Sequence, residues 1–187
     1  MPATPPTWNT LGCRNRVGRR RSRPVGSVGA EARLRELGLS LPPAVQLPAG
    51  VALPFAMVRV VGLRAIVSGH GPQAPDGTLA GPLGKVGLEV SPAQAQAAAR
   101  LVALSVLGSL RRELGSLDRI AAWVRVHGMV NAAPGFTALP QVINGFSAVV
   151  LEVFGPDTGQ HARSAVGLAE LPWGIPVEVE AEVLLRH

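Results

Sequence analysis

The stretch Val177-Glu178-Val179-Glu180-Ala181-Glu182-Val183 decides the fold, because its side chains alternate between apolar and acidic without a break. A period of two is typical of a β-strand that has one covered face and one open face. We therefore predict a strand over residues 177–185, with the apolar side chains facing helices and the glutamates on the opposite face.

A second segment, His161-Ala162-Arg163-Ser164-Ala165-Val166, places Arg163 fifteen residues before Glu178. We predict that it begins a strand over residues 163–169 and that this strand is adjacent to the strand of Glu178. The pair would offer one guanidinium for a carboxylate-bearing ligand and a row of carboxylates for handling water or protons.

Turn and capping residues divide the rest of the chain. Ser91-Pro92-Ala93-Gln94 is a capping box with proline at the first helical position, so it begins a helix that Gly115 ends. The other predicted elements are a short helix 27–37, a hairpin of strands 57–61 and 64–68, a glycine-rich loop or weak strand 77–87, a strand 120–130 and a helix 139–154.

Without the weak segment 77–87, the order of the main elements is β-β-α-β-α-β-β. Each long helix follows one strand and precedes another, which is typical of a split β-α-β arrangement with both helices on one face of the sheet. We expect one α+β sandwich, and the sequence contains no internal repeat.

The middle strand, 120–130, is expected to turn Val124 and Val126 toward the helices and Trp123, Arg125 and His127 toward the open face. Two interpretations of that face remain. It is simply solvated, or a second subunit covers apolar residues such as Trp123 and Met129, whose exposure to water would be costly.

Composition limits the class of protein. At 187 residues, with 47% apolar and 16% charged residues, the chain suits one compact domain and contains no run long enough to span a membrane. The only cysteine, Cys13, excludes a disulfide framework and fits a reducing cytoplasm. The histidines lack metal-binding spacing, so we expect no metal site.

The net charge of +6 comes entirely from residues 1–24, which contain six arginines and no acidic residue. The remaining chain has twelve Lys/Arg and twelve Asp/Glu, so it has no basic excess for nucleic acid. We expect residues 1–26 to form a disordered basic tail and 27–187 to form the domain. The tail has three interpretations: a targeting peptide, a nucleic-acid-binding arm, or sequence upstream of a true start near Val25 or Val28.

Arg163 and Glu178, with their surrounding motifs, resemble the RidA/YjgF family of enamine/imine deaminases, and the resemblance covers roughly residues 45–187. Ser68-Gly69 matches the family's Ser-Gly before its glycine-rich loop, and Pro54-Phe55 lies where the family has proline and tyrosine. Asn144 corresponds to a helix-borne asparagine, although its interval to Arg163 is two residues longer.

The resemblance implies a fold like that of the bacillus-type chorismate mutase, with a mixed sheet and two helices on one face. It also implies a homotrimer with three clefts between subunits and no cofactor. Arg163 would bind the substrate carboxylate and Glu178 would position the water. Ser68, Gly69, Phe55, Asn144 and His70 would contact the substrate, with His70 having the alternative of an ordinary loop histidine.

This sequence departs from the family at two positions. Phe55 lacks the hydroxyl of the family's tyrosine, and Ala165 stands where the family has a cysteine. The segment 135–155 also resembles that of a divergent branch. Three functions follow from the resemblance: hydrolysis of 2-imino or 2-enamino acids to keto acids and ammonia, non-catalytic binding of a small carboxylate metabolite, and the older label of nuclease, against which the neutral domain argues.

Overall fold

The structure is a computed structural model that describes residues 29–47 and 50–187. The tail predicted over residues 1–26, and the predicted beginning of the first helix, lie outside this range. The elements are α1 (Ala30–Glu36), β1 (Val58–Val61), β2 (Arg64–His70), α2 (Pro92–Leu114), η1 (Leu117–Arg119), β3 (Ile120–Asn131), α3 (Leu139–Gly159), β4 (Ala162–Leu168), η2 (Pro172–Gly174) and β5 (Val177–Leu185).

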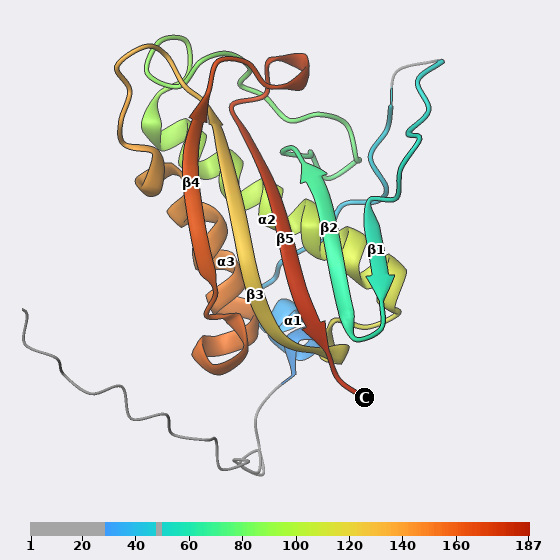
Figure 1. Cartoon of the computed structure of the whole chain (residues 1–187). Coiled ribbons are helices and arrows are strands. Elements are labelled where there is room, and N and C mark those ends of the chain that lie inside the picture. The colour runs from blue at the N-terminus through green and yellow to red at the C-terminus, as the bar shows by residue number, and fades with distance from the viewer. Residues whose placement is uncertain (1–28, 48–49) are drawn as a thin grey trace, which may run out of the picture.

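The strands form one mixed sheet in the order β1-β2-β5-β3-β4, where β3 and β4 are parallel and the other neighbours are antiparallel. The helices lie behind one face of the sheet, while the other face carries no helix (Figure 1). The predicted α+β sandwich is therefore confirmed. Of the two alternatives for residues 77–87, the glycine-rich loop is confirmed and the weak strand is not, because the segment has only isolated bridges at Leu79 and Val86.

Helix α2 forms as the capping box predicts. The Ser91 hydroxyl accepts from the Gln94 amide, the Gln94 side chain accepts from the Ser91 amide, and the helix ends at Gly115. Buried α2 residues such as Val102, Val106 and Leu110 pack in the core between the helices and the sheet.

Helix α3 contains a break close to its predicted end. Gly155 has φ 69° and ψ 173°, a backbone conformation that side-chain-bearing residues rarely adopt, and Pro156 follows it. One more helical turn then leads to Gly159. The predicted end at residue 154 therefore coincides with a break in the helix, but it is not the end, because the helical structure continues to Gly159.

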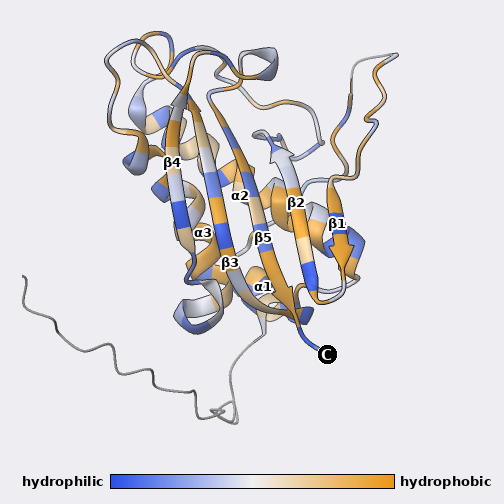
Figure 2. Cartoon of the chain, viewed as in Figure 1, coloured by the Kyte–Doolittle hydropathy of each residue, from blue (hydrophilic) through white to orange (hydrophobic). Residues whose placement is uncertain are grey.

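Strand β5 confirms the alternation that was read from its sequence. Val177, Val179, Ala181 and Val183 are buried, whereas Glu178 and Glu182 are partly exposed and Glu180 is exposed. Figure 2 shows the resulting mixture of hydrophilic and hydrophobic positions on the helix-free face.

The orientation predicted for Trp123 and Val124 is wrong. Trp123 is only 2% exposed and packs edge-on against Phe146 and Phe154 of α3, while Val124 is 41% exposed. The pairing of β3 with β5 shifts register between Trp123 and Arg125. This irregularity adds one residue to the period of two, so the side chains before it change faces.

Within the described residues, no helix is long and apolar enough to cross a membrane.

Candidate functional site

Glu178 lies at the start of β5, on the helix-free side of the sheet, directly over the backbone of Gly69 in β2. The pairing of β2 with β5 is irregular between Val67 and His70. A Cβ atom at Gly69 would lie only 1.8 Å from Glu178 Oε1, so a side chain there would displace the carboxylate. Burial raises the pKa of Glu178, and the neighbouring Glu180 carboxylate raises it further. The group is therefore a better proton acceptor than an ordinary surface glutamate.

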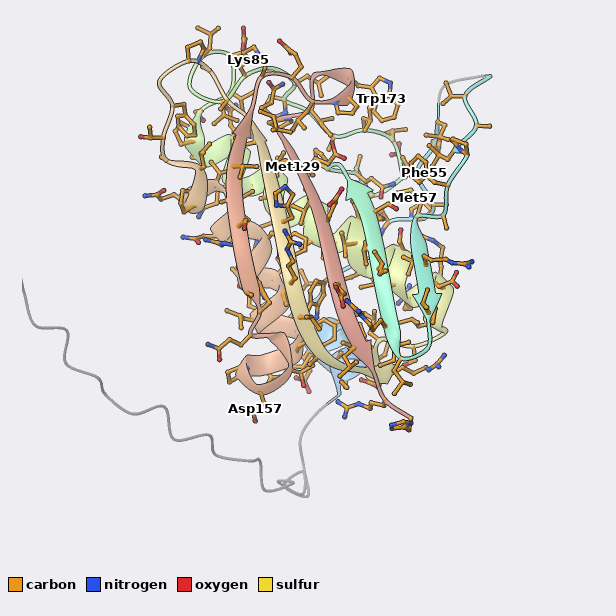
Figure 3. The ribbon with its side chains drawn as sticks, viewed as in Figure 1. Phe55, Met57, Lys85, Met129, Asp157 and Trp173 are labelled. Carbon is orange, nitrogen blue, oxygen red and sulfur yellow. The ribbon has the colours of Figure 1, made fainter. Side chains whose placement is uncertain are left out.

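Glu178 and Gly69 line a pocket of about 260 Å³. Most of its wall is apolar, contributed by the segment before β1, by Leu79 and by the turn η2. Phe55 and Trp173 are 53% and 50% exposed, and Figure 3 shows both at the same side of the molecule as Met57. Polar chemistry in this pocket is thus concentrated at a few groups, one of which is Glu178.

His70 also lines the pocket, but both of its ring nitrogens bind protein atoms. The Ser68 carbonyl oxygen, which can only accept, lies 2.7 Å from Nδ1, and Ser109 Oγ lies 2.8 Å from Nε2. Arg112 donates to Ser109 Oγ in turn. Burial, the largest cause, lowers the pKa of His70 to about 4. His70 is therefore neutral at pH 7, with Nδ1–H donating and Nε2 accepting, and it bounds the pocket without a free nitrogen.

Ser68 fixes the segment of the pocket wall that contains Phe55 through two hydrogen bonds. Its hydroxyl donates to the Ala56 carbonyl at 2.8 Å, and its amide donates to the Met57 carbonyl. Ser68 itself does not line the pocket. Its contribution in this chain is to fix the segment beside Phe55.

Arg163 lies in a second cluster, against α3. Its Nη1 donates to Asn144 Oδ1 and to Ser147 Oγ, both at 3.0 Å, and its Nη2 lies 3.4 Å from the Pro140 carbonyl oxygen. Partial burial lowers the pKa of Arg163 below its usual range. Among the described residues, Arg163 forms no salt bridge with Glu180 or with another acidic residue.

His161 extends this cluster. Its Nδ1 lies 2.7 Å from the Gly159 carbonyl, and its Nε2 lies 3.0 Å from Ser147 Oγ. Burial lowers the pKa of His161, and so does the neighbouring Arg163 charge, against the opposite effect of the Gly159 carbonyl. When His161 is neutral, its Nε2 accepts a hydrogen bond from the Ser147 hydroxyl, and the Ser147 oxygen accepts one from Arg163. The chain of contacts therefore holds the guanidinium in one position.

The prediction that Arg163 and Glu178 lie on adjacent strands is wrong. Strand β3 separates β4 from β5: Arg163 pairs with Val126, and Glu178 pairs with Met129. Val126 is buried toward the helices, and Met129, three residues later, belongs to the opposite face. Within one chain the two candidate side chains therefore lie on opposite faces of the sheet, two strand spacings (roughly 10 Å) apart across the sheet and three residues (roughly 10 Å) apart along it.

The structure brings together Glu178, Gly69, Phe55 and His70 around one pocket, and Arg163 with Asn144 elsewhere. Sequence reasoning assigned no role to Ser147, Trp173 or Gln73. Ser147 lies one helical turn after Asn144, which is a signal that could have found it. Trp173 and Gln73 come from loops, where periodicity gives no guidance.

Within the part of the chain that the structure describes, no three His, Cys, Asp or Glu side chains are grouped so that they could hold a metal ion. The chemical groups available are therefore one carboxylate with a raised pKa, one fixed guanidinium and apolar walls.

Comparison with known proteins agrees with this architecture. Residues 31–175 match the family model described as "YjgF/chorismate_mutase-like, putative endoribonuclease". The chain is 39% identical over 164 residues to Protein TCP17 of Trypanosoma cruzi. This alignment covers 87% of this chain and 98% of that protein.

Two solved structures are similar over most of their length. The protein Atu1372 of Agrobacterium tumefaciens, described as of unknown function, has 36% identity and a TM-score of 0.72, covering 83% of this chain and 91% of that one. A Shewanella oneidensis protein with the same endoribonuclease description has 28% identity and a TM-score of 0.74, covering 84% and 100%. The Escherichia coli YjgF product, 20% identical with a TM-score of 0.54 over 79% of this chain and 100% of that one, shares the fold.

The protein is an α+β protein whose sheet has one face without helices and whose apolar pocket contains a glutamate. The chain belongs to the YjgF/chorismate mutase-like family, and the expected fold is confirmed.

Proposed function

We propose that the protein hydrolyses 2-imino or 2-enamino acids to 2-keto acids and ammonia, in clefts formed between copies of the chain. The observation that carries this proposal is Glu178, a carboxylate with a raised pKa in a largely apolar pocket beside Gly69. Hydrolysis of an iminium needs a base that takes a proton from water at the reacting carbon.

In the proposed reaction, water attacks the iminium carbon and a C–O bond forms while Glu178 accepts a proton from that water. The protonated carboxyl then returns the proton to nitrogen. The C–N bond breaks while the hydroxyl group gives its proton to Glu178 and becomes the keto group, and the departing ammonia takes that proton away as ammonium. The reaction consumes one water and requires no oxidant or reductant. Glu178 is regenerated as a carboxylate.

Arg163 supplies the carboxylate-binding group in this proposal. A guanidinium binds a carboxylate through parallel hydrogen bonds, and its planar shape fixes the orientation of the ligand. Because Arg163 and Glu178 lie on opposite faces of the sheet in one chain, a shared substrate requires Arg163 from one copy and Glu178 from another. The same conclusion follows from the expectation of a homotrimer with clefts between subunits.

The helix-free face supports such an assembly. Ile66, Val124 and Leu184 on this face are each at least 40% exposed, and Met129 lies among the polar side chains there (Figure 3). Packing against other copies would remove this apolar surface from water. Trp123 takes no part, since it is buried in the core.

Non-catalytic binding of a small carboxylate metabolite is the second candidate. It is favoured by Phe55, which lacks a hydroxyl for the substrate, and by Ala165 in place of the family's cysteine. A nuclease activity finds little support, because from residue 25 onward the positive and negative charges balance.

Replacement of Glu178 by Gln tests the proposal. An amide retains the shape of the side chain but cannot accept a proton, so we expect hydrolysis of an imine generated in situ to fall at least about 100-fold while keto acid binding persists. Glu113→Gln, at an exposed glutamate on α2, is the matched control and should retain wild-type activity. Equal hydrolysis by wild type and Glu178→Gln would remove Glu178 from the mechanism. Binding without hydrolysis in the wild type would establish the binder.

A further inference from the structure

The pocket around Glu178 has a composition that restricts which substrates fit it. Nine of its fourteen lining residues are apolar, and they come from 45–47, 53–57, Leu79 and the region 172–175. An apolar cavity of about 150 Å³ is enough to hold benzene. The volume of about 260 Å³ in this chain therefore holds a large hydrocarbon side chain together with the reacting carbon.

The polar side chains that line the pocket carry no positive charge. Gln73, which is 5% exposed, donates one Nε2–H to the Gly77 carbonyl, so its amide oxygen can accept a hydrogen bond and its second N–H can donate one. Glu178 is a carboxylate, and both His70 nitrogens are occupied. No arginine or lysine lines the pocket. Its polar end thus suits a nitrogen that donates hydrogen bonds, while its remaining surface suits hydrocarbon.

Trp173 gives independent evidence that the apolar wall serves a ligand. It has φ 55° and ψ 15°, a left-handed conformation that is uncommon for a bulky residue, and it is nevertheless 50% exposed. Burial of the Trp173 ring in the core therefore does not explain this backbone conformation. Such outliers cluster at sites that hold ligands.

We infer that the pocket accepts a large apolar side chain of the substrate, with the imine nitrogen toward Glu178. The substrates are therefore imines of bulky aliphatic or aromatic amino acids rather than those with a one- or two-carbon side chain. This inference rests on the proposed function and adds the class of substrate to it.

Calorimetric titration of the full chain with pyruvate, 4-methyl-2-oxopentanoate and phenylpyruvate tests the inference. Each buried CH₂ group is worth about fourfold in affinity, so we expect the two bulky keto acids to bind at least about tenfold more tightly than pyruvate. Hydrolysis of imines generated from alanine, leucine and phenylalanine should rank in the same order by kcat/KM.

Trp173→Asn separates a ligand-binding role from a structural one. Asparagine tolerates the left-handed conformation, so the variant should fold, with an unchanged or higher melting temperature. It should lose at least about fivefold in affinity for phenylpyruvate and little for pyruvate, because only the former contacts the ring. Leu88→Asn, at a 71% exposed leucine outside the pocket, should change neither.

Pyruvate binding as tightly as phenylpyruvate, or Trp173→Asn weakening both equally, would overturn the inference while leaving imine hydrolysis intact. Failure of all three keto acids to bind, together with no imine hydrolysis, would overturn the proposed function as well.

Discussion

At the scale of single residues, two kinds of environment determine the chemistry of the site. Glu178 gains proton affinity because the pocket removes water from it, and Gly69 makes room for it by having no side chain. Arg163 instead keeps its charge and loses mobility, since Asn144 and Ser147 fix it against α3.

His70 makes the stability of the protein dependent on pH. Its folded pKa is about 4, whereas an unfolded histidine titrates near 6.5. Between these values the unfolded chain binds more protons, so the free energy of unfolding should fall as pH decreases from about 6.5 to about 4, by up to about 3 kcal/mol.

Urea unfolding of wild type and His70→Gln across pH 4–7 measures this contribution. Glutamine does not titrate, so the variant should lose less stability toward low pH. Parallel curves for the two proteins would show that His70 is not the group responsible.

Arg163→Lys retains a charge but loses the planar arrangement of donors. We expect affinity for a 2-keto acid to fall several-fold for lysine and about 10- to 100-fold for Arg163→Ala, in line with the loss of a charge-assisted hydrogen bond. Arg59→Lys, at an exposed position of β1, is the control. Unchanged titration curves for both Arg163 variants would reduce Arg163 to a structural role.

At the scale of elements, the sequence predicted what local periodicity and capping determine. The boundaries of β5 and the capping box of α2 follow from nearby residues and were found, and the helix end predicted at residue 154 marks the break at Gly155. The orientation of Trp123 was not, because a register shift in β3 depends on its pairing with β5. Local alternation contains no information about such a shift.

The position of β3 between β4 and β5 escaped prediction for a related reason. Strand order is set by long-range packing, whereas the sequence only shows that β4 and β5 are consecutive. The sequence therefore contains no sign that the residues predicted for one site lie in two separate clusters.

The contact between α2 and α3 depends on Gly145. A Cβ atom there would lie 2.1 Å from the Gln96 carbonyl oxygen, a backbone atom that moves only with its helix. We expect Gly145→Ala to lower the free energy of unfolding by about 1–3 kcal/mol through overpacking, despite alanine's better helix propensity.

Urea midpoints compare this variant with Gln141→Ala, an exposed substitution on the same helix that should be nearly neutral. A Gly145→Ala protein as stable as wild type would mean that the two helices separate at little cost.

At the scale of the whole molecule, the proposed function requires assembly, because the two clusters would form one site only between copies of the chain. Each chain presents Glu178 and its pocket on one face and Arg163 beside α3 on the other. In a ring of three copies, every chain can lend Arg163 to one neighbour and Glu178 to the other. Light scattering should therefore give a mass of three chains, not the 19.4 kDa of one.

Complementation tests the arrangement directly. At a substrate concentration well below KM, Arg163→Ala and Glu178→Gln proteins should each have at most about a tenth of wild-type activity as separate trimers. When the two are unfolded together in equal amounts and refolded, a cleft is intact where a chain with native Arg163 meets a chain with native Glu178. Random mixing of closed rings gives that combination in about a quarter of the clefts, so activity should recover to about 25% of wild type. If both residues served a substrate from the same chain, no mixed trimer would contain an intact site, and the mixture would stay as inactive as its components.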